Sequence, residues 1–183
     1  MKSQVNTWMK RALILITILL QHVGADELLI GDPAWGAHIT LPKAWENDNY
    51  MGTWYQGWTA DRKVWLSAIT FPEMPPNWHK KWLPKHCDTF GVTLTVPDGE
   101  IVAVEKQIGQ FKAQEYRISA SSEGEPVEVT ATVVRLAPKR LLLITVGGSK
   151  ADCLAHKEKL EEIIKSVRVA AVAQKDAAKK PTK

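Results

Sequence analysis

The chain has 183 residues, of which 24 are Lys or Arg and 20 are Asp or Glu, so its formal net charge is +4. The positive excess lies at the two ends, since three basic residues precede position 12 and residues 170–183 hold four Lys and one Asp. Residues 26–169 carry 17 basic and 19 acidic side chains. A folded part this close to neutral lacks the basic surface that binds phosphates, so we expect no nucleic-acid partner.

Residues 1–25 have the three-part layout of a secretory signal peptide: a basic start, the apolar run 12–20 and small residues ending at Ala25. As a helix, the apolar run would reach about 14 Å, against roughly 30 Å for the hydrocarbon core of a membrane. We expect cleavage between Ala25 and Asp26, although an uncleaved anchor is the alternative. The mature chain would then hold no integral membrane segment and be periplasmic or secreted.

Two segments remain after cleavage. The first, residues 26–169, is long enough for one domain of about 145 residues with a single core. The second, residues 170–183, is rich in Lys and Ala and has few large apolar side chains. It cannot offset the entropy lost on ordering, so we expect it to be disordered.

In chain order, runs of β-branched and aromatic residues predict strands, and clusters of Pro, Gly and polar residues predict the turns between them. The predicted elements are strands at 37–42, 53–59 and 64–71, a helix at 77–90, and strands at 101–108, 111–119, 127–136 and 141–146. The helix would begin with Asn77 as its N-cap and kink at Pro84. Short connections between the last four strands imply an antiparallel meander.

A final amphipathic helix is the clearest element in the sequence. Ser149 and Asp152 have the spacing of a capping box, with Asp in place of the usual Glu. One apolar stripe follows at helical spacing and comprises Leu160, Ile163, Ile164 and Val167. Such a stripe predicts a helix that covers one face of the sheet.

The order of these elements resembles the PsbP-like superfamily. The resemblance includes Leu41-Pro42 followed by Trp45 at the end of the first strand, and the closing run from Ile163 to Val169. It implies a single α+β domain, with an antiparallel sheet flanked by helices as an α/β/α sandwich. Members mostly bind protein partners and lack enzymatic activity. The family has no shared catalytic motif, so it assigns no catalytic residue.

The only two cysteines of the chain are Cys87 and Cys153. An even count in an exported protein favours a disulfide, which here would join the first helix to the start of the last one. The alternative is a pair of free thiols on opposite faces of the sheet.

A metal site is a second possibility for these residues. His79, His86 and Cys87 lie in the first helix, and Cys153 and His156 lie near the start of the last helix. Together they could form a tetrahedral set of soft ligands. Nothing in the spacing shows that the two groups meet, so solvent-facing histidines are the favoured interpretation and no cofactor is expected.

Seven tryptophans fall in the first half of the expected mature chain. Most can be explained as core residues, because an indole buries a large area. Trp54 and Trp58 share one face of a predicted strand, so they are the predicted binding residues, either for a protein partner or for a carbohydrate.

No Gly-rich phosphate loop, Gly-x-Ser-x-Gly or His-Glu-x-x-His motif occurs in the sequence. The acidic residues do not single out a general acid and its base. The sequence therefore predicts a non-enzymatic exported binding domain with a protein partner in the cell envelope. The alternative is a small-ligand binder for carbohydrate or metal.

Overall fold

The computed structural model describes residues 25–31, 36–50, 52, 54–95, 101 and 103–169. The strands are β1 (Ala25–Ile30), β2 (Ala37–Pro42), β3 (Glu46–Tyr50), β4 (Trp54–Trp58), β5 (Val64–Phe71), β6 (Val92–Leu94), β7 (Val104–Ile108), β8 (Phe111–Ser122), β9 (Glu125–Ala137), β10 (Arg140–Gly148) and β11 (Arg168–Val169). The helices are α2 (Trp78–Asp88), α3 (Lys150–Ala155) and α4 (Lys157–Lys165).

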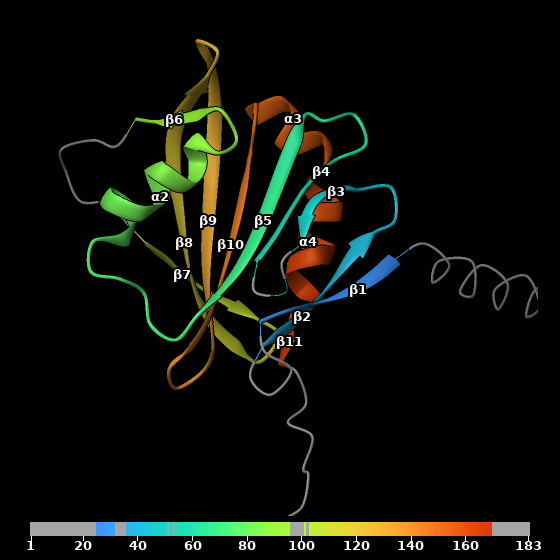
Figure 1. Ribbon diagram of the computed structural model, residues 1–183, viewed down its shortest axis with the longest axis vertical. Helices are drawn as coiled ribbons and strands as arrows, with labels where there is room; N and C mark the ends of the chain where they lie inside the picture. Colours follow the sequence, from blue (N-terminus) through green and yellow to red (C-terminus); the bar gives the residue numbers. More distant parts are fainter. Residues whose placement is uncertain are drawn as a thin grey trace, which may run out of the picture.

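Two antiparallel sheets organise the domain (Figure 1). The main sheet has the order β3-β4-β5-β10-β9-β8-β6. Strand β7 pairs with the first residues of β8, Phe111–Glu115. Strands β8, β9 and β10 are joined by short turns and form the predicted meander. The small sheet has the order β1-β2-β11, which brings the first and last described strands together.

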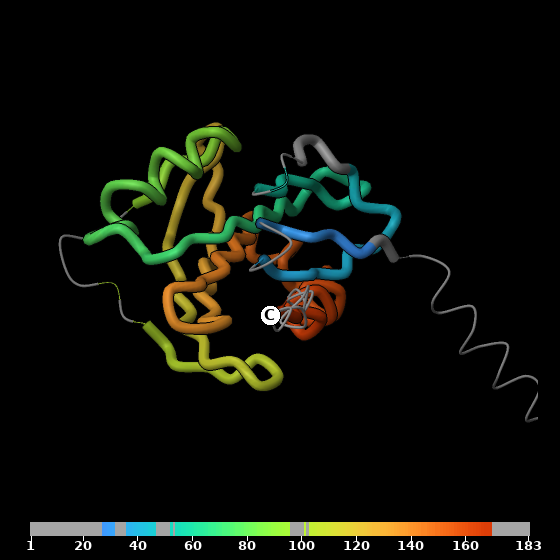
Figure 2. Tube along the Cα trace, turned by 60° about the horizontal axis from the view of Figure 1, so that its bottom comes forward, coloured from blue at the N-terminus to red at the C-terminus, as the bar shows by residue number. Residues whose placement is uncertain are grey.

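The central strands of the main sheet are buried on both faces. Along β10, Leu142 and Ile144 belong to one apolar cluster, while Leu143 between them belongs to the other. Such strands are nearly continuous in apolar residues because neither face meets water. We call the two sides of the main sheet the α4 face and the α2 face, after the helices that cover them. Figure 2 shows these helices well apart in space.

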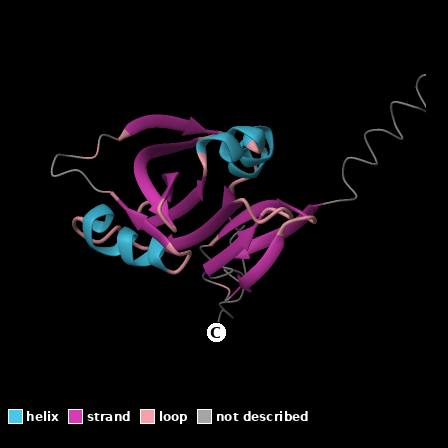
Figure 3. Cartoon of the chain, turned by 90° about the horizontal axis from the view of Figure 1, so that it is seen from above, coloured by secondary structure: helices cyan, strands magenta, loops and turns pink. Residues whose placement is uncertain are grey.

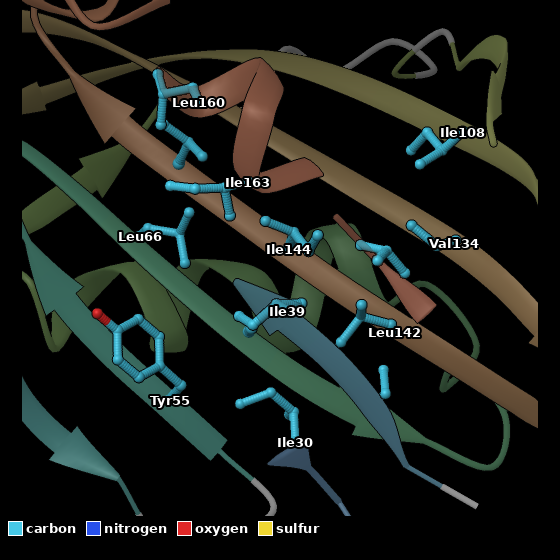
Figure 4. Packing of buried hydrophobic residues seen from close by; sticks show 14 of the residues in the cluster. Ile30, Ile39, Tyr55, Leu66, Ile108, Val134, Leu142, Ile144, Leu160 and Ile163 are labelled. Atoms are coloured by element: carbon cyan, nitrogen blue, oxygen red, sulfur yellow. The ribbon is translucent and has the colours of Figure 1, made fainter. Parts of the chain in front are cut away.

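On the α4 face, helix α4 and the small sheet pack together onto the main sheet. Leu160 and Ile163 come from α4, and Ile30 and Ile39 come from β1 and β2. Figure 4 shows them gathered with side chains of β4, β5, β9 and β10 in one cluster. At about 25 cal/mol per Å², each fully buried side chain of this size contributes roughly 1.5–3 kcal/mol.

The α+β fold with an antiparallel sheet flanked by helices is confirmed in outline, but the α/β/α sandwich needs a correction. The small sheet covers much of the α4 face, so that layer is not made of helices alone. The main sheet is also strongly curled (Figure 3). The domain is therefore dominated by strands. The sequence did not indicate β1, which begins inside the predicted leader, β3, which is rich in polar residues, or the very short strands β6 and β11.

The helices differ from the predictions in detail. Asn77 precedes α2 with a left-handed φ of 54°, and its side chain makes no capping hydrogen bond. Pro84 lies inside α2 without splitting it. The last helix is divided at His156 into α3 and α4. Its predicted cap is confirmed, since the Asp152 amide donates to Ser149 Oγ at 3.1 Å.

The predicted signal peptide, residues 1–25, lies outside the described residues except for Ala25, at which β1 begins. The predicted disordered tail, residues 170–183, lies outside them entirely. In the part of the chain that the structure describes, no helix is both long and apolar enough to cross a membrane.

Candidate functional site

Helix α2 rests on an aromatic layer that the main sheet provides. Trp65 of β5 is fully buried, and its ring stacks on Phe90 with centroids 3.9 Å apart and planes 14° from parallel. The next strand carries Gly147 opposite Trp65. A Cβ atom at Gly147 would overlap the indole, so only glycine leaves room for the ring. The glycine thus lets the Trp65 ring lie flat between the sheet and Phe90, which follows the end of α2.

A buried hydrogen bond fastens α2 to β5. His86 Nε2 lies 2.7 Å from Ser67 Oγ, and both residues are buried. The imidazole stacks on Trp82, with centroids 4.6 Å apart, and meets the Trp54 ring edge-on. Burial lowers the pKa of His86 to about 4, so the ring is neutral at pH 7. A substrate could reach Ser67 only if α2 moved away, so we assign the pair a structural role.

A groove also opens on the α2 face, at the end of the sheet that holds the β9–β10 turn. We call it the main groove. Its volume is about 640 Å³, within the range of ligand sites. The floor is apolar and includes Trp78, Tyr116, Val133 and Leu141. It comes from α2 and from three adjacent strands, so its shape rests on regular structure.

One wall of the main groove is ordered by a chain of hydrogen bonds. The Tyr116 hydroxyl donates to Gln114 Oε1 at 3.1 Å, and Gln114 Nε2 donates to Glu105 Oε1 at 2.8 Å. Trp78 contacts the Tyr116 ring edge-on, with centroids 5.2 Å apart. Burial, and secondarily the charge of Glu105, raises the pKa of Tyr116. The phenol therefore stays protonated and remains a donor.

Three cations stand around the main groove: Lys112, Arg135 and Lys139. All three are exposed, and none forms an ion pair with another described residue. Glu115 differs from these cations, because its buried carboxylate accepts hydrogen bonds from both Lys106 and Arg117. The buried charge of Glu115 is therefore paired, whereas the three cations of the groove have no ion-pair partner among the described residues.

A second, shallower groove lies at the β4–β5 hairpin, which we call the hairpin groove. Its volume is about 470 Å³, and it is lined by Gln56, Trp58, Arg62, Thr89 and Phe90. Trp58 is half-buried against Phe90, and the Arg62 guanidinium lies 5.9 Å from its ring centroid. Arg62 also forms an ion pair with Glu46, in which Arg62 Nε lies 3.1 Å from Glu46 Oε2.

The two predicted binding residues are therefore only partly accessible. Trp54 is half-buried beside His86, and its indole nitrogen is buried without a hydrogen-bond partner. Trp58 contributes one side of the hairpin groove. Their binding role stays a prediction.

The structure does not bring the predicted metal ligands together. Cys87 is buried on the α2 face, whereas Cys153 packs against the cluster of the α4 face. His79 stacks on the Tyr116 ring, with centroids 6.4 Å apart. Among the described residues, no three His, Cys, Asp or Glu side chains are grouped to hold a metal ion.

The predicted disulfide is likewise not found, because the thiols of Cys87 and Cys153 are free and lie on opposite faces of the sheet. Burial raises the pKa of Cys87 to about 12. The buried thiol is therefore protonated and acts as a core side chain.

His156 takes part in a surface network instead of a metal site. Its Nε2 lies 3.2 Å from Asp61 Oδ2, which links the junction of α3 and α4 to the turn between β4 and β5. Asp61 also accepts hydrogen bonds from the Thr59 hydroxyl and the Lys63 amide. The Thr59 bond, with further help from His156, lowers the pKa of Asp61 to about 2.

The sequence prediction missed the main groove because its residues come from five separate segments. The one available signal was alternation: Lys112, Gln114 and Tyr116 share a face of β8, and Val133 and Arg135 share a face of β9. Those two faces become a single surface only once the register of β8 and β9 is known.

No protein-family model matches the sequence, and no curated protein matches it in a sequence comparison. Solved structures do match. A cyanobacterial PsbP from Synechocystis has a TM-score of 0.53 at 12% identity, over 81% of this chain and 95% of that one. This chain has the PsbP-like fold. The resemblance predicted from the element order is thereby confirmed.

Two further structures share the fold. LpqN of Mycobacterium tuberculosis, described as involved in cell envelope biogenesis, has a TM-score of 0.51 at 13% identity, over 79% of this chain and 91% of that one. A Bacteroides thetaiotaomicron protein has a TM-score of 0.51 at 11% identity, over 76% of this chain. The chain spans about half the length of that Bacteroides protein, with 47% covered. These likenesses show the fold.

Proposed function

We propose that this chain is a non-enzymatic binding domain, exported to the periplasm or secreted, that engages a protein partner through the main groove. The observation that carries the proposal is an open groove of about 640 Å³ with an apolar floor and a charged rim. Apolar surface surrounded by polar groups is typical of sites that bind partners.

The construction of the groove supports this proposal. Tyr116, Val133 and Leu141 lie on three adjacent strands, and Trp78 is fixed by α2, so little conformational entropy is lost when a partner binds. Trp, Tyr and Arg are also the residues most often responsible for binding energy at interfaces. All three residue types occur in this groove.

The export part of the proposal has separate support. The basic and apolar layout of residues 1–25 is that of a signal peptide, and one protein of the same fold is described as involved in cell envelope biogenesis. Ser67 and His86 are buried, which argues against this pair as a catalytic nucleophile and base, because a nucleophile must be reachable by its substrate.

Site-specific photo-crosslinking in intact cells tests the proposal. A photoreactive amino acid replaces Gln114 or Lys139 at the main groove, Gln56 at the hairpin groove, or Lys150 as an exposed control at the far end of β10. We expect a discrete protein adduct from the main-groove positions and none from Lys150. Equal adducts from all positions, or adducts only from Gln56, would contradict the main groove as the binding surface.

A carbohydrate ligand at the hairpin groove is a second candidate. It is favoured by the half-buried Trp58 indole beside the polar side chains of Gln56, Arg62 and Thr89. This candidate keeps Trp58 as a binding residue, whereas Trp54 lies on the same face of β4 outside the lining of the groove. Titration with soluble cell-wall oligosaccharides, followed by Trp fluorescence, tests it: a saturable signal should disappear in Trp58→Ala and persist in Tyr116→Ala.

A further inference from the structure

The cations of the main groove are placed where like charges repel one another. Ala113 pairs with Val134 across β8 and β9, so Lys112 and Arg135 lie one position further along the same neighbouring strands. Both line the groove, and Lys139 adds a third positive charge from the β9–β10 turn. Like charges side by side on a sheet destabilise it. None of the three forms an ion pair with another residue that the structure describes.

The backbone conformation of Lys139 gives no structural reason for a lysine at this position. Its φ is 57°, a left-handed conformation that favours glycine or asparagine. A β-turn position of this kind gains nothing from lysine, since the side chain has no ion-pair partner among the described residues. Arg62, Asn77 and Glu123 have a positive φ as well, so the role in binding that we infer for Lys139 rests on its charge and its place at the groove.

The acidic residues of the groove do not remove this positive charge. Glu105 is engaged by Gln114 on the Tyr116 side of the groove. Glu73 is exposed in the loop between β5 and α2. Two carboxylates against three cations leave a net charge of +1, and the cations Arg135 and Lys139 are adjacent to the apolar floor, since Arg135 is the register partner of Leu141.

Resting on the proposed function, we propose that the main groove binds an acidic peptide segment of a protein partner. An apolar side chain of the segment packs on the floor of the groove, mainly on Tyr116 and Leu141, because Trp78 and Val133 are only 6% and 8% exposed. One or more neighbouring carboxylates pair with Lys112, Arg135 and Lys139. Arg135 can hold a carboxylate with two parallel hydrogen bonds, whereas the two lysines act as point charges.

A peptide fits this groove better than a lipid does. The groove is open, and its lining mixes apolar residues with amides, carboxylates and cations. An acyl chain requires an apolar enclosure, because each polar group that it covers loses its hydrogen bonds to water. A peptide supplies its own donors and acceptors to the Gln114 amide and the Glu105 carboxylate.

The test uses protein purified after expression of the full chain and a pair of labelled peptides. The acidic peptide is capped Phe-Leu-Gly-Asp-Glu, and the neutral one is Phe-Leu-Gly-Asn-Gln; both are also made in the reverse order. Binding is followed by fluorescence anisotropy. We expect the acidic peptide to bind at least roughly tenfold more tightly than the neutral one, and to weaken as salt rises from about 0.02 to about 0.3 M.

Matched variants show which residues cause the preference for the acidic peptide. Lys139→Gly removes a charge and suits a φ of 57°, so it should fold normally and bind the acidic peptide about threefold more weakly. The pair Lys112→Gln and Arg135→Gln should weaken binding about tenfold. Lys150→Gln removes an exposed lysine at the opposite end of β10 and should change nothing.

The outcomes separate this inference from the proposed function. If both peptides bind equally and Tyr116→Ala weakens both, the groove binds peptides but the acidic preference is wrong. If neither peptide binds, the inference is overturned, while the crosslinking pattern still decides whether the groove is a binding surface. Binding of phosphatidylglycerol vesicles that depends on Lys112 and Arg135, without peptide binding, would overturn it in favour of a membrane surface.

Discussion

Acidification should destabilise this protein through His86, beginning at a pH above that at which carboxylates titrate. The ring stacks on Trp82, meets the Trp54 and Phe90 rings edge-on and has Ser67 Oγ on Nε2. Burial lowers its pKa from 6.5 to about 4. The unfolded chain therefore takes up the proton first as the pH falls. Stability contributed by the neutral ring is complete above pH 6.5 and is lost as the pH falls toward 4.

The loss of stability on acidification can be calculated from the pKa shift of His86. At 1.36 kcal/mol per pKa unit, the full difference is about 3 kcal/mol, of which about 2 kcal/mol is lost between pH 7.5 and pH 5. For a domain of this size, that loss lowers the urea midpoint by about 1 M. Urea unfolding at several pH values, followed by Trp fluorescence, measures it directly.

The matched variant is His86→Gln, whose amide can still meet Ser67 but does not titrate in this range. It will be less stable than the native protein at pH 7.5, because the stacked imidazole is gone, yet its stability should hardly change down to pH 5. The other histidines are common to both proteins, so their contribution cancels. Parallel pH profiles for the two proteins would refute the assignment to His86.

Other expectations concern the core, the glycine under α2 and the thiols. Leu83→Ala, at a fully buried position of α2, should lower the free energy of unfolding by about 2–5 kcal/mol, whereas Leu154→Ala, at a residue 61% exposed, should change it by less than about 0.5 kcal/mol. Gly147→Ala should cost about 1–3 kcal/mol by forcing the facing indole of β5 out of place, and an unchanged urea midpoint would contradict that packing. Denatured without reductant, the protein should take up iodoacetamide at both Cys87 and Cys153, and in the native state Cys87 should react far more slowly; a chain that is not alkylated in denaturant would indicate the disulfide.

Local patterns in the sequence were enough to predict the centre of the fold. The alternation of Val127, Val129, Ala131 and Val133 along β9 does place those residues toward α2. The apolar stripe of the last helix does enter the core through Leu160 and Ile163. Both predictions depend only on the spacing of neighbours along one element, which the sequence displays directly.

The small sheet and the grooves could not be predicted in this way. β1 begins at Ala25, inside the predicted leader, and β11 is only two residues long, so neither has a periodic signal. The main groove depends on the register between β8 and β9 and on the packing of Trp78 against Tyr116. Trp54 and Trp58 were chosen for their shared face, which is correct, but that face is the one that α2 covers.

Lysine labelling in the native envelope is the most direct test of the main groove. Envelope fractions and the purified protein are treated with an acylating reagent, and modification of Lys112, Lys139 and the control Lys150 is followed by mass spectrometry. A partner in the groove should slow labelling of Lys112 and Lys139 several-fold in the envelope and leave Lys150 unchanged. Equal labelling of all three lysines in both preparations would contradict the main groove as the binding surface.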